Sequence, residues 1–321
     1  MMTCLRMMAS RLSIKPFFFF NVITFDGVFL SVNGFTIAGH VAVDRVITLY
    51  DEYVQLGGPP CFASALGKTL EFQVDVVTRI GEDFPSTLVS VIRSLGIPDE
   101  KRSKYPTTRF VLDYRCEPRE MRVPKTCEPI EASEVENADR LLICPIVDEI
   151  SDELLLDVDP DFLALDPQGL VRQINEDHTV SQKHWYNPKV LRKIDLLKTS
   201  SSELHLITGT SDIQRSLQKL IDLGVGVAVV TDGSNGSYVM AGKSFFRVPV
   251  YPVEVLDSTG AGDVFMAGLA SHLDEGLMWA CSIASASSSA IIETHGAEIK
   301  CRKEEILQRT QIIHENIKRL G

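Results

Sequence analysis

The 321-residue chain lacks the short motifs that mark many metal and redox sites. Its seven cysteines include no C-x-x-C pair, and their odd number argues against a secreted disulfide scaffold. None of its seven histidines stands in an H-E-x-x-H motif, so no histidine is assigned a catalytic or metal-binding role. No G-x-G-x-x-G follows the first predicted strand, which disfavours a nicotinamide-dependent enzyme.

Positive charge is also scarce in this chain. Lys and Arg number 32 against 43 Asp and Glu, so the formal net charge is -11. An acidic chain repels polyanions, and nucleic acid is therefore not expected as a partner. Phosphate chemistry stays open, because backbone amides and a metal ion can hold phosphate whatever the net charge.

The first 33 residues need separate treatment. Basic residues precede an apolar run that begins with four phenylalanines at 17–20, an order that is typical of a secretory signal. Asp26 interrupts this run, which is short for a membrane span, and no A-x-A-like site follows. We interpret residues 1–33 as an extension or a misplaced start, with a signal or anchor and an ordered segment as alternatives. The folded domain is expected at 34–321, with a cytoplasmic location and no membrane partner.

From residue 35 onward, short apolar runs alternate with amphipathic, helix-like segments. This alternation predicts an α/β fold with a parallel sheet covered on both faces. The predicted strands are 35–39, 72–78, 141–144, 162–166, 196–199 and 225–231. The predicted helices are 87–95, 211–223, 264–274, 277–293 and 303–320.

Two segments depart from this pattern. Residues near 45–57 and 105–125 alternate apolar and charged side chains, as exposed strands do. Each lies between parts of the α/β pattern, so we interpret them as excursions that form a small β-sheet lid. A plain surface hairpin is the alternative.

The strongest chemical signal is the string Asp257-Ser-Thr-Gly-Ala-Gly-Asp263, which precedes an apolar-periodic run. The glycines permit close backbone approach to a ligand, and the free amides at a helix N-terminus favour an anion. The predicted anion hole is made by the amides of Gly260, Ala261 and Gly262. Asp263 is then placed to accept the proton of an attacking hydroxyl as a general base.

This string resembles the C-terminal signature of the ribokinase-like, PfkB-type carbohydrate kinases, and the resemblance extends over residues 35–320. It implies a three-layer sandwich with a central, mostly parallel sheet and a small lid. It also implies ATP and Mg²⁺ as cofactors and Asp263 as the catalytic base. Lid strands in this family often pair between subunits, which favours a homodimer.

Further segments match this family in order. Family members have an acidic residue after the first strand that binds acceptor hydroxyls, and Asp44 matches it. The pair Gly57-Gly58 matches the family's di-glycine at the lid. Residues 230–237 resemble the nucleotide-binding strand and turn. The resemblance thus implies ATP contacts, which are assigned to Thr231, Gly233, Gly236 and Thr259.

Two departures from the family pattern bear on the substrate. Phe62 stands where an Asn usually touches the sugar, and the N-x-x-E motif, which helps to organise magnesium, keeps only Glu203. Both departures are similar to an archaeal subgroup that includes myo-inositol kinase, as is a D-x-Q-G-x-x-R stretch. That likeness places the side chains of Asp166, Gln168 and Arg172 near the acceptor or phosphate; a structural turn with a surface Arg is the alternative.

The resulting hypothesis is ATP-dependent phosphorylation of a hydroxyl on a small polyol or sugar, such as myo-inositol. Two alternatives remain: a nucleoside kinase of the same family, and a non-catalytic nucleotide- or sugar-binding regulatory protein on the same fold. The intact base and anion-hole string favours an enzyme over a binder.

Overall fold

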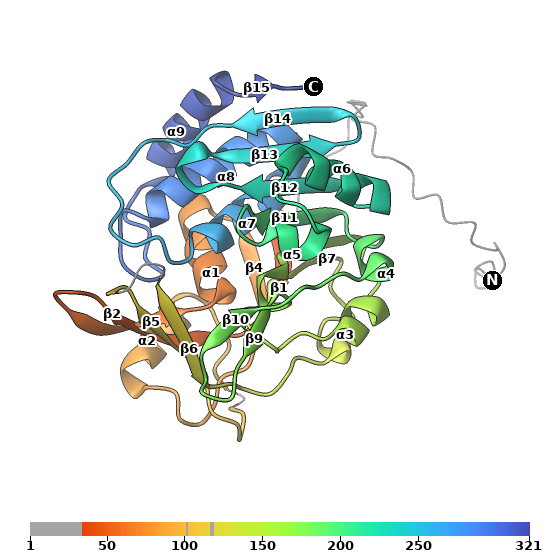
Figure 1. Ribbon diagram of the computed structural model, residues 1–321. Coiled ribbons are helices and arrows are strands. Elements are labelled where there is room, and N and C mark those ends of the chain that lie inside the picture. Colours follow the sequence, from red (N-terminus) through yellow and green to blue (C-terminus); the bar gives the residue numbers. More distant parts are fainter. Residues whose placement is uncertain (1–33, 101, 116–118) are drawn as a thin grey trace, which may run out of the picture. The chain divides into compact units, whose positions relative to one another are not determined.

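The computed structural model describes residues 34–100, 102–115 and 119–321. The interpretation of residues 1–33 falls outside this range. Within it, the main sheet has nine strands in the order β15-β14-β13-β12-β11-β8-β7-β1-β4. Its parallel part confirms the predicted α/β class, and all six predicted strands are present (Figure 1). These strands are β1 (Gly34–Ala38), β4 (Gln73–Val77), β7 (Arg140–Ile143), β8 (Phe162–Leu165), β11 (Leu196–Ser200) and β12 (Val227–Thr231).

One edge of the main sheet is antiparallel. Strands β13 (Ser237–Ala241), β14 (Ser244–Val248) and β15 (Lys318–Arg319) extend it beyond β12. The prediction of a helix to residue 320 is therefore wrong at its end. Helix α9 (Lys303–Glu315) stops earlier, because the following backbone pairs with the edge of β14.

Helices cover both faces of the sheet. One layer contains α1 (Pro59–Leu70), α7 (Ala261–Ser271), α8 (Leu277–Ile291) and α9. The other contains α3 (Asp152–Asp157), α4 (Pro188–Leu191), α5 (Leu204–Thr208) and α6 (Ile213–Leu223). Strand residues alternate between these layers: Leu196 packs with the first and Leu197 with the second. Buried apolar side chains on both faces thus give a three-layer sandwich.

Local signals explain where several helices begin and end. Pro59 and Pro60 start α1, a helix that the sequence analysis did not predict, because proline suits the first helical turn. Gly224 ends α6 in the left-handed conformation. Helix α2 (Ser86–Ser94) lies where a helix was predicted. Helix α7 starts at residue 261, three residues earlier than predicted.

A separate four-stranded sheet has the order β3-β2-β5-β6. Its strands are β2 (Ala42–Ile47), β3 (Glu52–Gly57), β5 (Thr108–Asp113) and β6 (Glu120–Lys125). The central pair β2 and β5 is parallel, whereas both outer pairings are antiparallel. We call this sheet the lid sheet. The hairpin of β9 (Arg172–Ile174) and β10 (Val180–Gln182) meets its β6 edge through a bridge between Arg122 and Thr179.

His40 lies just before β2 and is hydrogen-bonded to residues at or near the ends of β5 and β6. Its Nδ1 lies 2.8 Å from Thr108 Oγ1, and its Nε2 lies 2.9 Å from the carbonyl oxygen of Glu128. Burial lowers the pKa of His40, which keeps the ring neutral. The His40 side chain thus connects the segment before β2 with the start of β5 and with the segment after β6.

Candidate active site

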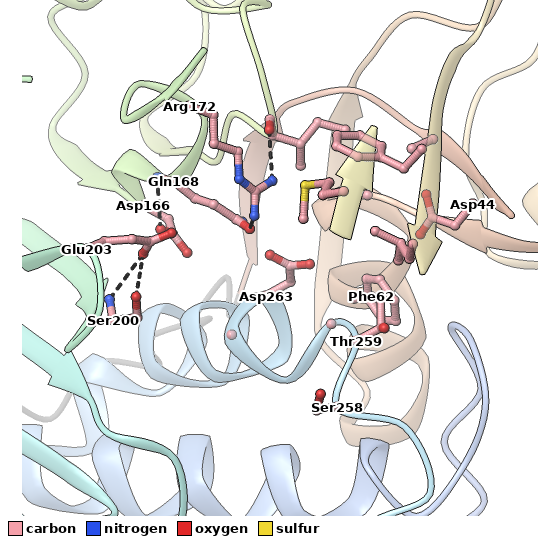
Figure 2. Close-up of a pocket in the computed structure, with 18 of the residues that line it drawn as sticks. Asp44, Phe62, Asp166, Gln168, Arg172, Ser200, Glu203, Ser258, Thr259 and Asp263 are labelled. Carbon is pink, nitrogen blue, oxygen red and sulfur yellow. Dashed lines mark hydrogen bonds between the residues drawn. The ribbon is translucent and has the colours of Figure 1, made fainter. Parts of the chain in front are cut away.

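A cavity of about 320 Å³ lies between the lid sheet and the carboxyl ends of the parallel strands. Figure 2 shows Asp263 on α7, with Asp44 and Phe62 on one side and Asp166, Gln168, Arg172 and Glu203 on the other. Of the predicted site residues, twelve line this cavity: Asp44, Gly58, Phe62, Asp166, Gln168, Arg172, Glu203, Thr231, Thr259, Gly260, Gly262 and Asp263. Segments far apart in the sequence therefore meet at one place.

Four predicted residues do not line the cavity. Gly57 lies behind Asp44, since a Cβ at Gly57 would stand 2.1 Å from Asp44 Oδ2. The amide of Ala261 donates to the carbonyl of Ser258 over 3.3 Å, which engages one of the three predicted anion-hole amides. Gly233 and Gly236 form the turn between β12 and β13, and the amide of Gly236 donates to the Gly233 carbonyl.

The loop before α7 is shaped by Gly260. Its φ of +79° is a left-handed conformation that favours glycine, and it lets the helix begin directly afterwards. The Asp257 carboxylate accepts a 2.8 Å hydrogen bond from the Thr259 amide and holds the loop from the other end. Gly262 and Asp263 then fall in the first helical turn, where amides have no partner one turn back.

Phe62 supports this loop from below. A Cβ at Gly260 would lie 2.2 Å from the Phe62 ring, so the ring packs directly against the glycine backbone. The ring is 1% exposed, and it also lines the cavity. Phe62 thus gives the cavity an apolar wall next to Gly260.

Two carboxyl groups in the cavity have strongly altered acidity. Burial, reinforced by Asp257 and Asp263, raises the pKa of Asp44 to about 7. Burial also raises the pKa of Asp263 to about 7, against the opposing effect of the Lys198 ammonium. A carboxyl group with a pKa near 7 is a stronger base than an ordinary aspartate, and it is still largely ionised at pH 8.

The D-x-Q-G-x-x-R stretch forms one wall of the cavity. Asp166 Oδ2 lies 2.6 Å from Lys198 Nζ, and its other oxygen accepts from the Gln168 amide. Arg172 donates to the Ile146 carbonyl over 2.9 Å and to the Gln168 side-chain oxygen. Asp166 is therefore the counter-ion of a lysine that the sequence analysis missed, although Lys198 is a charged residue inside an apolar strand run.

Glu203 lines the same cavity at the start of α5. Its Oε2 accepts hydrogen bonds from Ser200, at 3.3 Å from the amide and 2.7 Å from the hydroxyl. Ser200 occupies the position of the missing Asn in the N-x-x-E motif. The serine thus holds the glutamate at the carboxyl end of β11.

Two further kinds of feature are absent from the part of the chain that the structure describes. Among the described residues, no group of three or more His, Cys, Asp and Glu side chains is arranged to hold a metal ion. In the same part of the chain, no helix combines the length and the apolar character that crossing a membrane requires.

The model of the pfkB family carbohydrate kinases matches residues 52–304 of this chain. The chain therefore belongs to the PfkB family of carbohydrate kinases, and to the sugar and nucleoside kinases that this family comprises. A cytidine kinase of Thermococcus kodakarensis is 25% identical over 75% of this chain and 88% of that protein. An ATP-dependent 6-phosphofructokinase of Thermoanaerobacterium thermosaccharolyticum is 34% identical, but over only 28% of either chain.

Solved structures have the same fold. A pyrophosphate-dependent kinase of the ribokinase family, in complex with a pyrophosphate analog and myo-inositol, matches with a TM-score of 0.72 at 22% identity. The match covers 85% of this chain and 99% of that one. Ribokinase of Arabidopsis thaliana, with ribose and ATP bound, matches with a TM-score of 0.67 at 21% identity over 86% and 98% of the two chains.

Proposed function

We propose that this chain transfers the terminal phosphoryl group of ATP to a hydroxyl of a small, neutral polyol or sugar. One observation carries the proposal: Asp44 and Asp263 line one cavity together with the first-turn backbone of α7. Such a cavity can bind an alcohol, deprotonate it and stabilise the charge of a transferred phosphoryl group.

Asp263 is the general base in this proposal. Its carboxylate accepts the hydroxyl proton while the alcohol oxygen forms a bond to the terminal phosphorus of ATP. The bond from that phosphorus to the bridging oxygen breaks, and ADP leaves with the electron pair. The Gly260 and Gly262 backbone faces the cavity, and their amides donate hydrogen bonds to the phosphoryl oxygens.

Asp44 and the lid sheet bind the acceptor. Asp44 accepts hydrogen bonds from acceptor hydroxyls, while Phe62, Phe110 and Leu112 offer apolar surface to the carbon skeleton. Because Asp44 and Asp263 both become negative near neutral pH, an acceptor that already carries phosphate is disfavoured directly next to them. Arg119, Arg172 and Lys198 also line the cavity, so the proposal of a neutral acceptor rests on these two carboxylates alone. Myo-inositol is the first compound to test, because a structural neighbour was solved with it.

The residues present fit a Mg²⁺ ion that arrives with the donor. Mg²⁺ typically keeps several waters and uses one or two carboxylates besides the substrate phosphates. Glu203 would hold it through water, since one of its oxygens is already engaged by Ser200. When bound, the ion neutralises phosphate charge.

Nucleotide contacts are part of the same proposal. Thr231 and Thr259 both line the cavity, and we propose that they contact the donor phosphates. Gly233 and Gly236 lie outside the cavity, in the turn after β12, and are proposed to contact the rest of the nucleotide. We also propose a cytoplasmic location, because ATP is available in the cytoplasm.

We further propose a homodimer through the lid sheet. Leu49, Tyr50 and Val54 are exposed apolar side chains on or beside its β2–β3 hairpin, and an apolar strand edge favours pairing. Sedimentation velocity of the wild-type chain tests it, and a monomer across micromolar concentrations would contradict it.

A phosphoryl-transfer screen tests the function. Purified chain is incubated with Mg²⁺ and either ATP or pyrophosphate, and with myo-inositol, pentoses, hexoses or nucleosides. Product formation from ATP and a neutral polyol or sugar is expected. Preference for cytidine or another nucleoside would support the nucleoside kinase alternative, which the Thermococcus relative favours. Nucleotide binding without transfer to any acceptor would support the non-catalytic alternative.

A further inference from the structure

Lys198 is a buried cation that lines the cavity. It lies on β11, and the alternation of that strand directs it to the face covered by α7, as for Leu196. Its side chain is 6% exposed and its Nζ lies 2.6 Å from Asp166 Oδ2. A lysine is almost never buried to this extent without a partner, and the ion pair explains how it stays charged.

The ammonium group lies against the anion hole. A Cβ at Gly262 would stand 2.7 Å from Lys198 Nζ, so the lysine reaches the backbone of the first turn of α7. An ammonium group carries three N–H donors, and the ion pair with Asp166 uses one. Since Lys198 and Gly262 both line the cavity, the remaining donors face the place where phosphate is proposed to bind.

The charges around Lys198 agree with this position. Burial opposes the charged form, but the carboxylates of Asp166, Asp263 and Glu203 together outweigh it and raise the pKa of Lys198. The ammonium in turn lowers the pKa of Asp263, which burial has raised. Lys198 is therefore charged at neutral pH and acts electrostatically on the proposed base.

We propose that Lys198 is a further catalytic residue, whose ammonium group donates a hydrogen bond to a non-bridging oxygen of the transferred phosphoryl group. The proposal rests on the proposed function. Lys198 keeps its proton throughout, because the proton of the alcohol goes to Asp263. Its contribution is a fixed positive charge that stabilises the developing negative charge, with Asp166 as its counter-ion.

A structural ion pair between β8 and β11 is the competing explanation. Buried ion pairs are costly to desolvate and add little stability over apolar packing. A pair that only joined two strands would also have no reason to press against the Gly262 backbone of a different element. The position of the ammonium therefore favours a ligand role.

The test uses Lys198→Gln and the double variant Lys198→Gln/Asp166→Asn, in which no unpaired charge remains buried. Lys219→Gln is the control for the loss of a lysine hydrogen bond, because the exposed Lys219 donates a 2.8 Å hydrogen bond to the Thr208 carbonyl outside the cavity. Thermal unfolding checks the fold of each variant. Should the single variant fail to fold, the double variant alone decides the outcome.

The expected result is a loss of roughly 10²- to 10³-fold in kcat for both Lys198 variants, the range for a lost electrostatic donor. The acceptor KM should change little. In the single variant the pH midpoint of kcat should move upward, because the cation that lowers the pKa of Asp263 is gone. This shift shows only that the charge of Lys198 acts on Asp263, so kcat of the double variant and the affinity for polyphosphate distinguish a ligand role from a structural one. The control should match the wild type.

Three outcomes would overturn the assignment. One is a folded single variant with kcat within threefold of the wild type. Another is activity restored in the double variant, which would show an ion pair with a structural role. The third is an unchanged affinity of the Lys198 variants for tripolyphosphate and for a non-hydrolysable ATP analog, measured by calorimetry, which does not depend on turnover. Loss of a charged hydrogen bond should instead weaken this binding roughly tenfold or more. Absence of transfer by the wild type would instead refute the proposed function.

Discussion

The raised pKa of Asp263 makes a strong prediction about the pH dependence of turnover. With a pKa of about 7, the carboxyl group is about 90% ionised at pH 8 and about 1% ionised at pH 5. Only the ionised form can accept the hydroxyl proton. We therefore expect kcat to fall about a hundredfold between pH 8 and pH 5, with a tenfold change per pH unit in the acid limb. An aspartate with the ordinary value of 3.8 would remain more than about 90% ionised at pH 5 and give a nearly flat profile.

The assay follows ADP release at saturating ATP, Mg²⁺ and acceptor across this range. The terminal phosphate of the donor also titrates, so a control is needed that removes the base alone. Asp263→Asn should lower kcat by about two to four orders of magnitude and leave a residual rate without the steep acid limb. Its thermal unfolding should show an intact fold, because the side chain lines a cavity.

Two results would refute this reasoning. A wild-type kcat that is constant from pH 5 to pH 8 would show that the base has an ordinary pKa or is another residue. An acid limb of equal slope in Asp263→Asn would assign the titration to the donor.

Three further predictions concern the residues around this base and the proposed metal ion. Gly260→Ala should lower kcat by about a hundredfold, since a Cβ would collide with the Phe62 ring and displace the loop. Gly96→Ala is the control for backbone strain alone, because Gly96 has a φ of +76° and a Cβ there would meet no atom within 4 Å. An equal loss of activity in the two variants would contradict the argument from collision with Phe62. Asp44→Asn should weaken acceptor binding yet stabilise the fold at pH 8 by at most about 4 kcal/mol. The sign follows because the raised pKa of Asp44 means that the folded state binds its proton more tightly than the unfolded state, so wild-type stability falls as pH rises from about 4 through 7. Urea unfolding of both proteins at pH 5 and pH 8 measures the stabilisation by Asp44→Asn. An equal stabilisation at the two pH values would show that the raised pKa is not its cause. Chelation of Mg²⁺ by EDTA should abolish transfer, with recovery on adding excess Mg²⁺; undiminished turnover would remove the ion from the mechanism.

Much of the fold could be predicted from local patterns. Most of the six parallel strands are apolar runs, because both faces of their sheet are covered, and the hydrophobic effect leaves that composition in the sequence. The predicted helix at 211–223 ends where α6 does, at the residue before Gly224, whose left-handed conformation is a local property. Helix α1 was missed, although its two leading prolines are an ordinary helix start. The strand at 318–319 was not predictable, because its conformation depends on pairing with β14, more than 70 residues earlier in the chain.

The candidate site, too, could be predicted only in part from local sequence. The string from Asp257 to Asp263 already implies a helix start with an adjacent carboxylate, since capping glycines and first-turn amides are local features. Only the structure shows that the Ala261 amide is engaged by Ser258. Only the structure shows, too, that Phe62 both packs against Gly260 and lines the cavity.

The sequence by itself determined the class of this protein, because its sheet pattern and the string from Asp257 to Asp263 are encoded in neighbouring residues. The tertiary structure alone decided the electrostatics of the cavity. Lys198 and Asp166 are 32 residues apart, and they become an ion pair only when β8 and β11 lie side by side. The acidity of Asp44 and Asp263 likewise depends on burial, a property that the folded chain creates and no single segment carries.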